Sequence, residues 1–122
     1  MADYTVFRDR FRDKKVFKTP VKTITIGAAE TTGSFTILGN ALIHTITVQI
    51  PDWTNTVTLT LTIADVDSVN IYTSSALAQN TNHIITDLKD SIPIWGVNTF
   101  TATLSGVPGG SGGDVSISVY FI

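Results

Sequence analysis

The sequence predicts an all-β protein: a single β-sandwich or jelly-roll-like domain of about eight short antiparallel strands, preceded by an extended N-terminal arm. Three observations lead to this prediction. Thr, Ile and Val dominate the chain after residue 20, and β-branched side chains suit a pleated surface better than a helix. Apolar and polar residues alternate through most of this region. Gly, Pro, Asn and Asp interrupt the alternation at short intervals, as turns do.

The arm comprises residues 1–20, and the predicted domain comprises residues 21–122. A helix would place like charges four residues apart, Arg8 beside Arg12 and Arg10 beside Lys14, and each such pair is destabilising. An extended chain instead puts all four cations on one side and the intervening Phe and Asp residues on the other. We therefore expect an extended arm.

Three strands are expected in the first part of the domain. The first begins around Ile24 and ends at Gly27, and the second is a short strand around Phe35 that ends at Gly39–Asn40. The third is longer, and alternation puts five of its side chains on one inward face: Leu42, His44, Ile46, Val48 and Ile50.

The clearest alternation follows at residues 57–63, where threonines face outward and apolar residues inward: Val57, Leu59, Leu61 and Ile63. The polar run Asp65–Asn70 lacks the Gly and Glu positions of an EF-hand calcium loop, so it predicts a turn. Short strands are expected at residues 69–72 and at Ile84–Ile85.

A corner is expected at Pro93–Gly96. Strands at 100–104 and 115–121 then face each other across a Gly-rich connection, which we expect to be a hairpin tip with several positive φ angles. It is no phosphate loop, because Asp114 stands where a Walker loop has its Lys. If exposed, this tip could form a contact loop, made of Gly109, Gly110, Ser111, Gly112 and Gly113.

No pattern of catalytic or metal-binding residues is present in the sequence. His44 and His83 are far apart, and neither has further ligands at a recognisable spacing. There is no Gly-x-Ser-x-Gly motif to activate a serine, and Glu30 is the only glutamate. We predict that the protein is not an enzyme and uses no metal or cofactor.

Two tryptophans leave an alternative open. Trp53 and Trp95 each lie close to a proline at an expected corner. Exposed indoles on a β-sandwich can stack on sugar rings, so a carbohydrate-binding module is the alternative from another class. Indoles that plug the ends of the sandwich would explain the same residues without any ligand.

Composition argues for a soluble protein made in the cytosol. The chain has no Cys, hence no disulfide or thiolate site. No apolar run approaches the ~20 residues that span a bilayer, so no membrane contact is expected. The charged N-terminus lacks the apolar core of a secretory signal.

Charge is divided sharply along the chain. The first 22 residues hold seven of the eight basic residues and three acidic ones, a formal charge of +4. The remainder carries Lys89 against seven acidic residues, a formal charge of −6. A positive arm on a negative body suggests attachment to a partner.

The arm also carries four aromatic residues among its first 17, whereas solvating tails are poor in aromatics. Arg together with aromatic residues is typical of interface anchors. We expect the arm to bind a protein through Tyr4, Phe7, Arg8, Arg10, Phe11, Arg12, Lys14, Lys15, Phe17 and Lys18. DNA is the rival partner for the cations, but the interleaved Asp9 and Asp13 argue against nucleic acid.

Three runs in the second half resemble small virion proteins of tailed bacteriophages. They are LTLTIADVD at 59–67, IYTSSALA at 71–78, and FTATLSGVPGGSGG at 100–113, which the strand at 115–121 follows. The similarity covers about residues 57–122, roughly half of the chain. The arm has no counterpart in it.

This resemblance implies a virion structural protein, made in the host cytoplasm and present as a homo-oligomer in the particle. Its partner would be the major capsid protein or another virion protein. A head decoration or cement protein is the favoured interpretation, and a tail or head–tail component is the alternative. The resemblance supplies no catalytic residues.

Overall fold

The computed structural model describes residues 17–86, 88 and 92–122. The described chain is all-β, as predicted, and contains no helix. Every strand pairing is antiparallel. The strands are β1 (Phe17–Lys18), β2 (Lys22–Ile26), β3 (Thr32–Ile50), β4 (Thr58–Ala64), β5 (Asn70–Thr73), β6 (Leu77–Ala78), β7 (Thr81–Ile85), β8 (Ile92–Leu104) and β9 (Gly113–Phe121).

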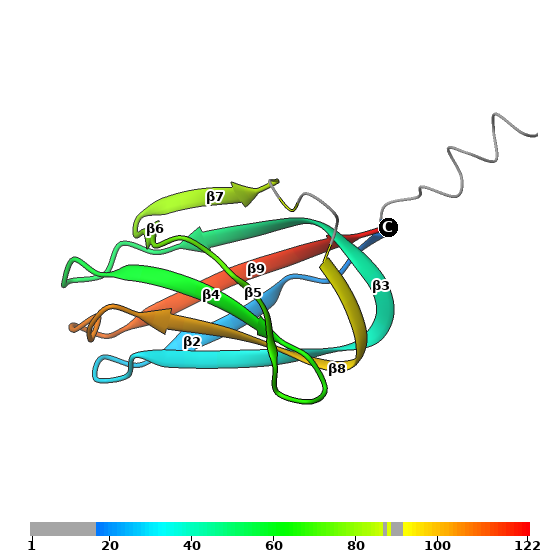
Figure 1. Ribbon diagram of the computed structural model, residues 1–122. Helices are drawn as coiled ribbons and strands as arrows, with labels where there is room; N and C mark the ends of the chain where they lie inside the picture. The colour runs from blue at the N-terminus through cyan, green and yellow to red at the C-terminus, as the bar shows by residue number, and fades with distance from the viewer. Residues whose placement is uncertain (1–16, 87, 89–91) are drawn as a thin grey trace, which may run out of the picture.

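Strand β3 organises the fold, because its two halves belong to different layers (Figure 1). Its first half pairs with β8 from Thr32↔Thr103 to Ile43↔Ile92. In the same layer, β8 pairs with β4 on its other side, and β4 pairs with β5. Its second half pairs with β7 on one side and with β9 on the other, and β9 continues to β2 and β1. One sheet therefore folds over at β3 and packs against itself.

Two predicted breaks are absent from the strands. Gly39 and Asn40 were expected to end a short strand, but they pair with Gly96 and Trp95 inside β3 and β8. The corner expected at Pro93–Gly96 is wrong for the same reason. Gly96 has φ +69°, and its N–H donates to Asn40 Oδ1 at 3.3 Å. The turn-forming residues here shape two paired strands and do not end them.

A β-bulge in β3 also corrects its predicted inward face. The register shifts between Ile43 and Thr45 where β3 pairs with β9. One extra residue reverses which side chains face the core. Ile46, Val48 and Ile50 are buried as predicted, but Leu42 and His44 are exposed, and Ile43 is buried instead.

The core lies between the two layers and follows the other predicted alternations. The inward residues expected at 57–63, 100–104 and 115–121 are all buried. Phe100 is fully buried and stacks on Phe35 with ring centroids 5.0 Å apart. Burying such side chains is the main favourable term in the stability of a domain of this size.

The Gly-rich connection between β8 and β9 is not a hairpin. The two strands do not pair with each other: β8 pairs with β3 and β4, whereas β9 pairs with β3, β2 and β1. The connection instead passes from one layer to the other. The expected positive φ angles are present at Gly109, Gly110 and Gly112.

The predicted turn after β4 is built around one carboxylate. Asp65 Oδ1 accepts hydrogen bonds from the backbone N–H groups of Asp67 and Val69, both at 2.9 Å, and Ser68 has φ +65°.

We expect Asp65→Ala to lower the free energy of unfolding by about 1–2 kcal/mol, because two turn N–H groups lose their acceptor. Urea denaturation measures this loss. Asp67→Ala is the matched control, since its carboxylate has no hydrogen-bond partner among the described residues; an equal loss in both variants would contradict the account.

Candidate functional site

The last residues of the arm belong to the sheet of the domain. Phe17 pairs with Phe121 and Lys18 with Tyr120. The backbone N–H of Thr19 donates to the Val119 carbonyl at 2.9 Å, and the Val119 N–H donates to Thr19 Oγ1 at 3.2 Å. These contacts fix the point at which residues 1–16 join the domain. The other expected binding residues of the arm, from Tyr4 to Lys15, lie outside the described residues.

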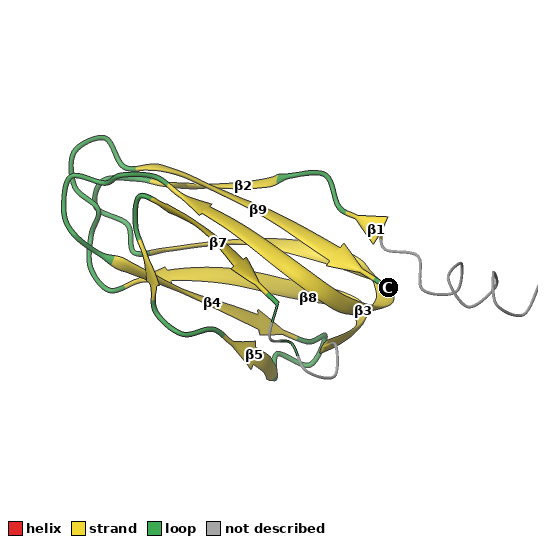
Figure 2. Cartoon of the chain, turned by 90° about the horizontal axis from the view of Figure 1, so that it is seen from above, coloured by secondary structure: helices red, strands yellow, loops and turns green. Residues whose placement is uncertain are grey.

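The side chains at this point fit the predicted binding chemistry. Phe17 is 61% exposed, and the Lys18 ammonium lies 5.8 Å from the centroid of the Tyr120 ring. Figure 2 shows β1 beside the C-terminus and the bend of β3. Leu42 in that bend exchanges two backbone hydrogen bonds with Ile122. The arm therefore joins the domain at one end of the molecule.

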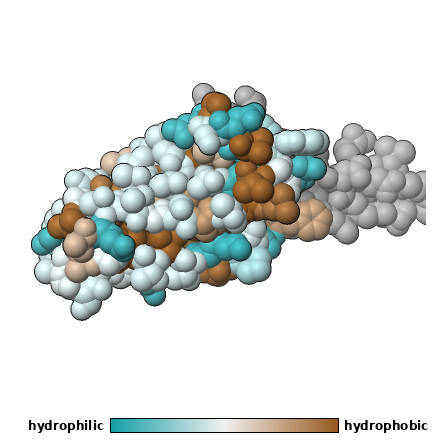
Figure 3. All heavy atoms as spheres, turned by 90° about the horizontal axis from the view of Figure 1, so that it is seen from below, coloured by the Kyte–Doolittle hydropathy of each residue, from teal (hydrophilic) through white to brown (hydrophobic). Residues whose placement is uncertain are grey.

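Close to this end, the outer face of β3 and β8 carries an apolar patch, which we define as Leu38, Leu42, Trp95 and Val97. Leu38 lies directly opposite Val97 across the two strands, and it is 77% exposed. Figure 3 shows hydrophobic side chains gathered in a band on this face. Contiguous exposed apolar surface often marks an interaction site. The sequence did not reveal the patch, because Leu42 was assigned to the core.

The two tryptophans differ in their surroundings. Trp95 is 70% exposed, as a stacking surface requires. Trp53 is 4% exposed and its indole N–H is buried without a partner, so its ring presents no face to a sugar. Trp53 instead packs in the core at the loop end of the sandwich.

The expected contact loop is partly anchored. Asn55 donates its backbone N–H to the Pro108 carbonyl at 2.8 Å and its side-chain amide to the Val107 carbonyl at 3.0 Å. The N–H of Gly109 donates to the Ala28 carbonyl at 3.1 Å. Gly110 and Ser111 are exposed, whereas the other three residues of the loop are half-buried.

The histidines make local contacts. His44 Nδ1 lies 2.7 Å from Thr45 Oγ1, and His83 Nε2 lies 2.8 Å from the Ala78 carbonyl oxygen. Within residues 17–86, 88 and 92–122, no three His, Asp or Glu side chains are grouped to hold a metal ion. The same residues include no helix that could serve as a membrane span.

No protein-family model matches the sequence, and no curated protein does either. A structure of infectious bursal disease virus, Gx strain, matches 87% of this chain and 32% of that chain, with a TM-score of 0.38 and 15% identity. A crystal structure of a particle of the same virus matches 88% and 30%, with a TM-score of 0.39 and 14% identity. The chain spans about a third of the length of those chains. Likeness at this level identifies neither a family nor a function.

Proposed function

We propose that the chain is a non-enzymatic structural protein of a virion, in which the arm attaches the domain to a neighbouring protein. The observation that carries this proposal is the point at which the arm joins the domain. The first 22 residues carry a formal charge of +4 and four aromatics, and they join an acidic domain at one end, where Phe17 and an apolar patch are exposed. The sequence resemblance to small phage virion proteins supports the same function.

The finer proposal is a decoration or cement protein of a phage head that binds the major capsid protein. Residues 1–16 can span roughly 55 Å when fully extended. An extended segment can therefore reach across a capsid subunit, its cations meeting carboxylates and its phenylalanines filling pockets. Binding then requires several anchors to bury together, because ordering such a segment costs conformational entropy.

The composition of purified particles tests this function. Particles of the virus that encodes the chain are separated into heads and tails, and each fraction is analysed by quantitative mass spectrometry. We expect many copies in the head fraction, in fixed proportion to the major capsid protein. Copies in the tail fraction alone would favour a tail component, and absence from both would overturn a virion function.

A further inference from the structure

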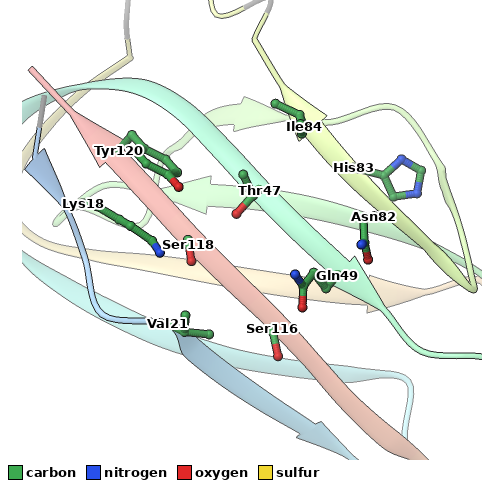
Figure 4. Close-up of a pocket in the computed structure, with 10 residues that line it drawn as sticks. All are labelled: Lys18, Val21, Thr47, Gln49, Asn82, His83, Ile84, Ser116, Ser118 and Tyr120. Atoms are coloured by element: carbon green, nitrogen blue, oxygen red, sulfur yellow. The ribbon is translucent and has the colours of Figure 1, made fainter.

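The outer face of β7, β3 and β9 contains a groove of about 320 Å³. Its floor is built from two rows of paired residues (Figure 4). In one row Gln49 lies between Asn82 and Ser116, and in the other Thr47 lies between Ile84 and Ser118. Lys18 and Tyr120 close one end. These residues come from four strands that are distant in sequence.

The groove concentrates hydrogen-bonding groups that the fold does not use. Five of its side chains, those of Thr47, Gln49, Asn82, Ser116 and Ser118, make no hydrogen bond to any residue that the structure describes. Several polar side chains elsewhere on the domain do bond to the backbone, among them Asn55, Gln79, Ser74 and Ser105. Amides and hydroxyls offer donors and acceptors together, which is what a polyhydroxylated ligand needs.

The charge of the groove differs from that of the domain. The chain after residue 22 has a formal charge of −6, yet no carboxylate lines the groove, and the Lys18 ammonium does. The Lys18 ammonium lies over the Tyr120 ring, so an apolar ring face and a cation occur together. A pyranose ring packs its C–H groups on an aromatic face, and a cation favours an acidic substituent.

We propose that this groove binds a short acidic saccharide, one that carries a carboxylate or a sulfate. Its volume is at the small end of ligand pockets, roughly 300–1,000 Å³. Tyr120 packs against a sugar ring, Lys18 pairs with the acidic group, and Gln49 and Asn82 bond to hydroxyls. The site shares only Lys18 with the arm and does not include Trp95, and it adds surface adhesion to the proposed function without depending on it.

The test is an NMR titration of the isotope-labelled full chain with a sulfated uronic-acid disaccharide. We expect saturable shifts of the Gln49 and Asn82 side-chain amides and of residues 116–120. Lys18→Ala and Gln49→Ala should each weaken binding at least tenfold, with unchanged unfolding free energy because both side chains are exposed. Lys22→Ala is the matched control, because it removes the same charge from the neighbouring strand but does not line the groove.

Further ligands and a second control separate the alternatives. A neutral disaccharide should bind the native chain at least tenfold more weakly than the sulfated disaccharide does. The Trp95→Ala variant should bind the sulfated disaccharide as tightly as the native chain does. The proposal is overturned if the groove signals do not shift, if Lys22→Ala weakens binding as much as Lys18→Ala, or if inorganic sulfate binds as tightly as the disaccharide. If the groove does not bind the saccharide, the proposed virion function still stands, because the composition of purified particles tests it independently.

Discussion

Gly112→Ala is expected to lower the free energy of unfolding by about 3 kcal/mol or more. Gly112 has φ +71°, which L-residues rarely adopt, and a Cβ there would overlap the carbonyl oxygen of Ile26. The overlapped atom is backbone in β2, so no side-chain rotation relieves it. The chain must shift where it passes between the two layers of the sandwich.

Gly39→Ala provides the control for this prediction. Gly39 lies in the sheet, in β3, and a Cβ there would meet no heavy atom within 4 Å. Its unfolding free energy in urea should change by less than about 1 kcal/mol. Equal losses in the two variants would show that the connection is not built around the conformation of Gly112.

Removing residues 1–16 is expected to abolish attachment to particles while leaving the domain folded. The cut must stop before Phe17, because Phe17 and Lys18 pair with β9 and Thr19 bonds to Val119. Interface anchors rich in Arg and aromatic residues commonly contribute several kcal/mol, so we expect affinity to fall at least about 100-fold. Pelleting of labelled protein with particles that lack it measures the affinity, and urea denaturation confirms the fold.

Two arm variants separate the contributions of charge and apolar contact. Phe7→Ser with Phe11→Ser keeps every charge, and Arg8→Gln with Arg10→Gln keeps every ring. Both should weaken attachment if the arm fills pockets and pairs with carboxylates. A loss confined to the Arg variant, with a steep dependence on salt, would indicate binding to nucleic acid instead.

The sequence pattern within one segment correctly predicted those strands and turns that depend only on residues of that segment. The strands at 57–63 and 115–121 alternate with period two, and one face of each is buried as expected. The Asp65 turn was predicted equally well, because a carboxylate that bonds to N–H groups two and four residues ahead needs no distant partner.

Features that depend on pairing could not be predicted in this way. The continuity of β3 through Gly39–Asn40 depends on β8, and the bulge that exposes Leu42 depends on β9. The Gly-rich connection has the composition of a hairpin tip, yet its flanking strands pair with other partners. The groove and the apolar patch join residues from different strands, so neither leaves a pattern in one segment.

A photo-reactive amino acid at position 11, in place of Phe11, tests the attachment most directly when the protein is irradiated in assembled particles. If the arm binds a neighbouring chain, mass spectrometry will find cross-links from this position to a different virion protein. The finer proposal predicts that this protein is the major capsid protein. Cross-links confined to the same chain's own domain would contradict the account.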